Sequence, residues 1–125
     1  MAKTVLIVED EQSMQRALKN KLDHAGYAVI AANDGEEAVE ALRSSTKPDL
    51  VLLDLIMPKL DGISVLRQMK ADDTLRGVPV VILTNLSSGD KVAEAMQLGT
   101  FDFLVKANYS LDDVLKKVND RLGGP

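Results

Sequence analysis

The stretch Leu50-Val51-Leu52-Leu53-Asp54 decides the fold, because four apolar residues run without interruption and end on a carboxylate. Short continuous runs of this kind are typical of strands that are buried on both faces of a parallel sheet. Four further runs have the same character, at residues 4–8, 28–31, 80–83 and 103–105. The sequence therefore predicts five buried strands.

Amphipathic stretches separate these runs. In the last of them Leu111, Val114 and Val118 recur at steps of three and four, which marks one apolar face of a helix. A similar stripe follows each of the other four strands. Strict alternation of strand and helix predicts a doubly wound α/β fold with right-handed crossovers. With five strands we expect the flavodoxin-like parallel order 2-1-3-4-5.

Helix ends and the domain limits follow from local signals. A serine or aspartate three residues before an acid marks a helix start, and this spacing occurs at Asp34, Ser87 and Ser110. We expect one domain over residues 1–122, because 125 residues are too few for two domains. Residues 123–125 are interpreted as a frayed tail or a remnant left by cloning.

The composition excludes several classes of protein. The chain has no cysteine, which rules out disulfides and zinc–thiolate sites and fits a reducing cytoplasm. A net charge of -4 without a basic stripe argues against direct nucleic-acid binding. No apolar run approaches the ~18 residues that span a bilayer. Because residues 1–3 lead straight into the first predicted strand, we expect no signal peptide. We expect a cytoplasmic protein that binds neither nucleic acid nor membrane.

Chemically active residues stand where the predicted strands end. In this strand order, ligands bind beyond the carboxyl ends of the strands, where strands one and three diverge. The strand ends carry Glu9-Asp10-Glu11, Asp54, Thr84 and Lys106, whereas the second strand ends in the uncharged Ala32-Asn33. We therefore expect an acidic cluster, a hydroxyl and an ammonium group to converge at one edge.

Three crowded carboxylates need a counter-charge. Glu9, Asp10 and Asp54 would raise one another's pKa unless a cation neutralised them. Mg²⁺ prefers oxygen ligands and typically uses one or two carboxylates together with phosphate oxygens. No histidine or cysteine lies near these strand ends, which disfavours zinc and copper. A carboxylate beside Mg²⁺ and Lys106 suggests in-line phosphoryl transfer onto Asp54, with Thr84 meeting a phosphoryl oxygen.

Five motifs carry a family resemblance. They are residues 5–11, residues 50–58, Leu60-Asp61-Gly62, residues 82–84 and residues 103–106. In this order and at these spacings, they resemble the receiver domain of bacterial two-component response regulators, of the chemotaxis-regulator type. The resemblance covers about residues 3 to 122.

The resemblance implies a role for each matching residue. Asp54 is the phosphoacceptor, and Glu9 and Asp10 form the acidic pocket for Mg²⁺, which Mn²⁺ can replace. The Ile56 carbonyl is a further metal ligand, and Lys106 is the family's lysine. Thr84 is the switch hydroxyl, and Phe103 is the switch aromatic that turns inward on activation.

Three features of the sequence depart from the family pattern. Lys106 is followed by Ala107 rather than proline, and a cis bond before a non-proline residue costs about 2.5–4 kcal/mol, so its geometry stays open. Phe103 replaces the commoner tyrosine. Thr84 is followed by Asn85 and Leu86, where the family usually has a small residue and often a polar one. We hypothesise that Ile56 and Leu86 flank the acceptor with apolar side chains, hinder an attacking water and prolong the phosphorylated state.

Partners also follow from the resemblance. A sensor histidine kinase or phosphotransfer protein would donate the phosphoryl group, and a downstream protein would bind the face of the fourth helix, fifth strand and fifth helix. We expect a monomer or weak homodimer, and a protein that promotes its own phosphorylation without being a turnover enzyme.

Three other functions were weighed. A scaffold that works without phosphorylation would be favoured by a missing acceptor, acid or lysine, and none is missing. A Mg²⁺-dependent phosphatase generally needs a second acid two residues after its nucleophile, where this chain has Ile56. A flavin carrier needs a phosphate-binding loop after the first strand, where Glu9-Asp10-Glu11 would repel phosphate. For Phe103, a plain core position was the main alternative.

Overall fold

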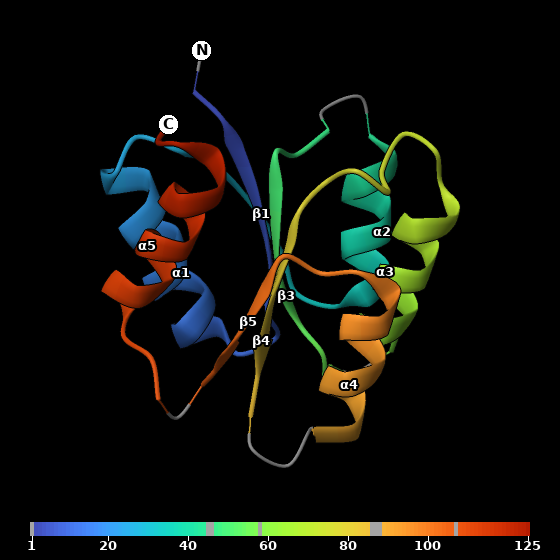
Figure 1. The fold of residues 1–125 in the computed structure, drawn as a ribbon. Coiled ribbons are helices and arrows are strands. Elements are labelled where there is room, and N and C mark those ends of the chain that lie inside the picture. Colours follow the sequence, from blue (N-terminus) through green and yellow to red (C-terminus); the bar gives the residue numbers. More distant parts are fainter. Residues whose placement is uncertain (1, 45–46, 58, 86–88, 107) are drawn as a thin grey trace.

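The computed structural model describes residues 2–44, 47–57, 59–85, 89–106 and 108–125. Five strands alternate with five helices along these residues (Figure 1). Their bounds are β1 Thr4–Val8, α1 Gln12–His24, β2 Ala28–Ala32, α2 Gly35–Arg43, β3 Leu50–Asp54, α3 Gly62–Ala71, β4 Val80–Thr84, α4 Gly89–Leu98, β5 Asp102–Val105 and α5 Leu111–Leu122.

The sheet has the predicted order. Its strands lie as β2-β1-β3-β4-β5, and each neighbouring pair is parallel. Helices α1 and α5 cover one face of the sheet, and α2, α3 and α4 cover the other. Because the strands are parallel, their carboxyl ends lie at the same edge, which is the lower edge in Figure 1. Within the described ranges, each helix is too short or too polar to cross a bilayer.

The central strands explain the uninterrupted apolar runs. Every residue of β3 and β4 is buried. Alternate residues of β3 enter opposite cores: Leu50 and Leu52 pack in the cluster under α1 and α5, and Val51 and Leu53 pack in the cluster under α2 and α3. Because successive side chains of a strand point to opposite faces, a strand covered by helices on both sides must be apolar throughout.

The prediction that all five strands are buried is wrong for the two edges of the sheet. In β2, Ala28 and Ala31 are exposed, and in β5 Phe103 is exposed. An edge strand has a neighbouring strand on one side only, and the helices cover it less completely. A short apolar run has the same sequence pattern in either position, so the sequence could not distinguish them.

Capping residues begin three of the helices. The Asp34 side chain accepts a hydrogen bond from the Glu37 N–H at the start of α2, and Ser110 and Asp113 form a capping box at α5. Both starts were predicted. Asp61, part of the motif Leu60-Asp61-Gly62, is the N-cap of α3 and accepts a hydrogen bond from the Ser64 N–H. Ser87 lies outside the described residues.

The start of α3 lies directly against the end of β3. A Cβ atom built on Gly62 would lie 2.3 Å from the Asp54 carbonyl oxygen and 2.7 Å from the Leu55 Cα. The Gly62 N–H donates to the Leu55 carbonyl at 3.1 Å. Glycine at position 62 therefore permits the close approach of α3 that supports the backbone of Asp54.

Replacing Gly62 with alanine should destabilise the protein. Alanine normally improves a helix by up to ~1 kcal/mol over glycine, but here its methyl group overlaps backbone atoms that cannot move aside like a flexible side chain. We expect the free energy of unfolding in urea to fall by about 1–3 kcal/mol, the usual cost of overpacking.

Gly89→Ala is the matched control, because a Cβ atom there would meet nothing within 4 Å. This variant should be as stable as the wild type or slightly more stable. Equal stability of Gly62→Ala and the wild type would contradict the close-approach interpretation.

Candidate functional site

Asp54 is held by two contacts at the carboxyl end of β3. Asp54 is buried, with only 4% of the residue exposed. The Lys106 ammonium donates to its Oδ2 at 3.0 Å, and the backbone N–H of Ile56 donates to its Oδ1 at 3.2 Å. Both carboxylate oxygens are thus oriented before any ligand binds.

Lys106 joins two acids that come from different strands. Its Nζ lies 2.8 Å from Oε1 of Glu9 as well as 3.0 Å from Oδ2 of Asp54. Glu9 follows β1 and is fully buried. Because β5, β1 and β3 are separated in sequence, only the parallel sheet brings these three side chains to one edge.

The charges in this cluster do not balance. The pKa of Glu9 is raised from 4.5 to about 7: burial is the largest cause, the Lys106 ammonium opposes the rise, and the neighbouring Asp54 carboxylate adds to it. Burial lowers the pKa of Lys106, but its contacts with Glu9 and Asp54 outweigh burial and leave the pKa above its usual value. Lys106 is therefore a permanent cation, and one cation serves two buried acids.

A third acid completes the cluster. Carboxylate oxygens of Glu9, Asp10 and Asp54 all lie within 4.8 Å of one another, and Asp10 is exposed at the mouth of the site. Three hard oxygen donors around an excess of negative charge fit Mg²⁺ or Mn²⁺. The predicted role of the Ile56 carbonyl stays a prediction; the Ile56 side chain is 45% exposed beside the acceptor.

Gln15 supports the acidic loop and was missed in the sequence. Its Nε2 donates to the carbonyls of Glu9 at 2.9 Å and Ala32 at 3.2 Å, and it contacts Oδ1 of Asn33 at 3.0 Å. This buried amide fastens the start of the β1–α1 loop to the end of β2. The available signal was a polar residue in the buried stripe of α1, ahead of Leu18 and Leu22.

The two predicted switch residues differ in burial. Thr84, at the end of β4, is buried, and its hydroxyl donates to the Asn85 carbonyl at 3.2 Å. Phe103 in β5 is 40% exposed, so the alternative of a plain core position is wrong. Leu86 and Ala107 lie outside the described residues, so the second flanking position and the Lys106-Ala107 bond stay as predicted.

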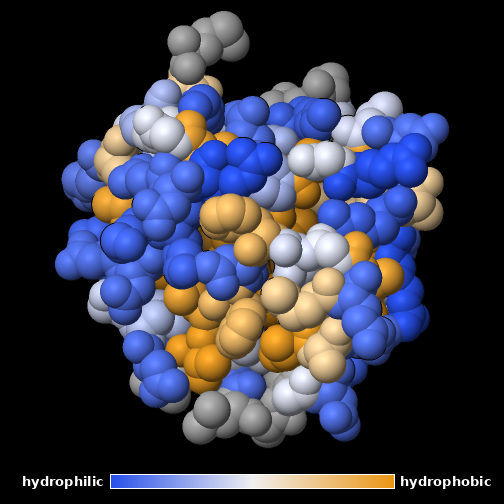
Figure 2. Space-filling model, in the orientation of Figure 1, coloured by the Kyte–Doolittle hydropathy of each residue, from blue (hydrophilic) through white to orange (hydrophobic). Residues whose placement is uncertain are grey.

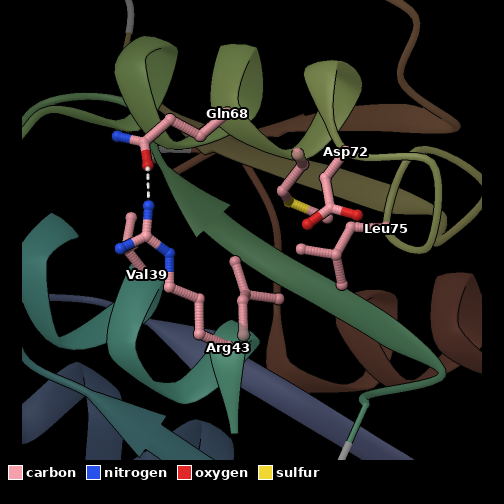
Figure 3. Close-up of a pocket in the computed structure, with 7 residues that line it drawn as sticks. Val39, Arg43, Gln68, Asp72 and Leu75 are labelled. Atoms are coloured by element: carbon pink, nitrogen blue, oxygen red, sulfur yellow. Dashed lines mark hydrogen bonds between the residues drawn. The ribbon is translucent and has the colours of Figure 1, made fainter.

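A separate hollow lies between the carboxyl-terminal parts of α2 and α3 (Figure 3). Its walls include Val39, Arg43, Gln68, Asp72 and Leu75, and Arg43 donates to Gln68 across it at 3.5 Å. Because the helices run opposite to the strands, this hollow lies at the far edge of the sheet from Asp54. Its mixture of apolar walls and a single carboxylate does not resemble the acid cluster.

Comparison with known proteins agrees with this geometry. The sequence profile described as the response regulator receiver domain matches residues 5–119. The chain belongs to this family. As a receiver domain of two-component response regulators, it has the role of a phosphoacceptor, and the family generally binds Mg²⁺ at an acidic pocket.

Similar proteins include one curated relative and two solved structures. The receiver domain is 38% identical over 106 residues to the alkaline phosphatase synthesis transcriptional regulatory protein PhoP of Bacillus subtilis, covering 85% of this chain and 43% of PhoP. The signal receiver domain of a histidine kinase from Syntrophus aciditrophicus is 35% identical, with a TM-score of 0.87, covering 98% of this chain and 91% of that chain.

The phosphorylated cyanobacterial phytochrome response regulator RcpA is 30% identical to the receiver domain, with a TM-score of 0.85, covering 96% of this chain and 93% of that chain. The chain spans less than half the length of the curated relatives it matches.

The raised pKa of Glu9 predicts how stability depends on pH without metal. A carboxyl whose pKa rises on folding, here from 4.5 to about 7, binds its proton more tightly when folded. The stabilisation is therefore complete below the unfolded pKa and is lost as pH rises through the folded pKa. In EDTA, urea unfolding should show stability falling between about pH 5 and pH 7.

Glu9→Gln is the control, because its neutral amide cannot ionise. Its stability should change less over the same pH range, and saturating Mg²⁺ should reduce the pH dependence of the wild type. An identical pH profile for the variant and the wild type in EDTA would assign the effect to another group.

Proposed function

We propose that this receiver domain is a phosphorylation-controlled signalling module in which Asp54 accepts a phosphoryl group from a sensor histidine kinase or a phosphotransfer protein. One observation carries the proposal: the buried Asp54 carboxylate is oriented by Lys106 and by the Ile56 N–H, beside Glu9 and Asp10. A carboxylate placed in this way is equipped to act as a covalent nucleophile.

In the transfer, a lone pair on an Asp54 carboxylate oxygen forms an O–P bond. The P–N bond of the donor's phosphohistidine breaks, and its electron pair leaves with the imidazole nitrogen. The product is an acyl phosphate on Asp54. Positioning and charge neutralisation are the protein's main contributions to such a reaction. The similar structure of RcpA is described as phosphorylated, which supports the same chemistry here.

Neighbouring side chains complete the reaction site in this proposal. Lys106 is already 3.0 Å from Asp54 Oδ2, close to the oxygens that gain negative charge. The Thr84 hydroxyl leaves the Asn85 carbonyl for a phosphoryl oxygen. Glu9, Asp10, Asp54 and the Ile56 carbonyl hold Mg²⁺ or Mn²⁺, which supplies neutralising charge when bound.

The signal is read on the face formed by α4, β5 and α5. Figure 2 shows hydrophobic side chains in the middle of this face, where Met96, Phe101 and Phe103 are each at least 40% exposed. Exposed apolar groups within a polar rim are typical of a protein-binding surface. We propose that Phe103 turns inward on phosphorylation and changes this face for a downstream protein.

The proposed protein is a switch rather than a turnover enzyme, and acts as a monomer or weak homodimer in the cytoplasm. A constitutive scaffold on the same fold is the alternative. The two differ in whether a pull-down of the downstream protein changes when beryllofluoride, a phosphoryl mimic, is added with Mg²⁺.

Acceptance of the phosphoryl group can be measured directly. Incubation with Mg²⁺ and acetyl phosphate should give a single phosphoryl adduct by intact mass, because Asp54 can attack a small donor without a kinase. Asp54→Asn should give none, while His24→Gln, on the exposed end of α1, should label like the wild type. No adduct on the wild type, or equal labelling of Asp54→Asn, would contradict the proposal.

The hypothesis that Ile56 and Leu86 shield Asp54 predicts a slow loss of the phosphoryl group. Replacing Ile56 and Leu86 together with asparagine should admit and orient water, and raise the dephosphorylation rate about tenfold, a barrier change of ~1.4 kcal/mol. Decay of the phosphorylated form after removal of acetyl phosphate measures this rate, and the final extent of labelling checks that the acceptor is intact. An unchanged decay rate would refute the shielding hypothesis.

A further inference from the structure

Two buried side-chain oxygens lack a hydrogen bond within the part of the chain that the structure describes, and both lie near the acid pocket. They are the hydroxyl of Tyr109 and Oε1 of Glu9, and the Glu9 oxygen is compensated by an ion pair with the Lys106 ammonium at 2.8 Å. An ionised carboxylate oxygen can only accept a hydrogen bond, whereas a phenol can donate one. Native proteins rarely leave a buried hydroxyl without a partner, because such burial costs free energy. The two groups are therefore complementary.

Tyr109 occupies the connection between β5 and α5, three residues after Lys106. Its ring packs against the core cluster under α1 and α5, together with Met14 and Leu111. The charged groups that act on its hydroxyl are those of Lys106, Glu9, Asp54 and Glu11, and burial raises its pKa to about 12. The hydroxyl is therefore a neutral donor close to the acids.

Lys106 at present compensates the charge of Glu9. Its Nζ lies at ion-pair distance from Oε1 of Glu9 but directs a hydrogen bond to Oδ2 of Asp54. Phosphorylation would move the negative charge of Asp54 outward onto the phosphoryl oxygens. Lys106 would follow that charge, and the buried Oε1 of Glu9 would lose its nearest protein cation.

We propose that Tyr109 is a positioning residue whose hydroxyl donates a hydrogen bond to Oε1 of Glu9, directly or through one water, when Lys106 turns to the phosphoryl group. The inference rests on the proposed function and extends it. Because Tyr109 lies two residues before the first residue of α5, the new bond connects the phosphorylation site to one edge of the readout face.

The chain offers a matched pair of variants. It has two tyrosines and no tryptophan. Tyr27 packs in the same core cluster as Tyr109, but its hydroxyl already donates to Oδ1 of Asn119. Tyr109→Phe and Tyr27→Phe therefore remove the same hydroxyl from the same core, one unpaired and one paired.

Two quantities are measured for each variant: the affinity for beryllofluoride in the presence of Mg²⁺, and the free energy of unfolding in urea without ligand. Tyr109→Phe should match or exceed the wild type in ligand-free stability, because it loses an unpaired hydroxyl, yet bind beryllofluoride about three- to tenfold more weakly, the range expected for one hydrogen bond. Tyr27→Phe should be less stable and bind beryllofluoride like the wild type.

Fluorescence gives a second readout that a merely structural role would not move. In Tyr27→Phe, Tyr109 is the single tyrosine of the chain. Because its hydroxyl gains a hydrogen bond in the proposal, its emission should change when beryllofluoride is added to the Mg²⁺-loaded protein. Wild-type beryllofluoride affinity in Tyr109→Phe, or unchanged emission in Tyr27→Phe, overturns the inference. If the wild type does not bind beryllofluoride, the proposed function is contradicted. If the wild type binds it and only the Tyr109 results fail, the inference alone is contradicted.

Discussion

The ion-pair bridge of Lys106 is the interaction on which the site depends. One ammonium group from the end of β5 lies within 3.0 Å of carboxylates from the ends of β1 and β3. Burying a charge is costly unless it is paired, and here one cation serves two buried acids, with Asp10 beside them. The remaining negative charge lies at the acidic pocket where receiver domains generally bind Mg²⁺.

The surrounding fold keeps this unbalanced cluster in place. Completely buried central strands fix the ends of β3 and β4. Gly62 lets α3 support the backbone at Asp54, and Gln15 ties the Glu9 carbonyl to β2. These contacts stabilise the backbone around the site. The unbalanced charge is therefore confined to a few side chains, which would rearrange on phosphorylation in the proposed function.

Helix α4 is packed less deeply than the other helices. Ala95 is its one buried residue among those described, and ion pairs between Lys91 and Asp61 and between Arg67 and Glu94 link it to α3. Weakly packed elements are the usual sites of conformational change. In the proposed switch, charge rearrangement at the strand ends would reach the α4–β5–α5 face through this lightly packed helix.

The sequence by itself determined the alternation of buried strands and helices and the identity of the acids, and it favoured the strand order 2-1-3-4-5, because strands covered on both faces must be apolar and parallel strands end at one edge. The residues that follow those runs, Glu9, Asp54 and Lys106, could therefore be predicted to meet. Only the tertiary structure decided that Lys106 bridges two acids, that Gln15 fastens their loop, and that the Tyr109 hydroxyl has no hydrogen-bond partner among the residues that the structure describes. These facts depend on side-chain contacts between segments far apart in the chain, which local periodicity does not encode.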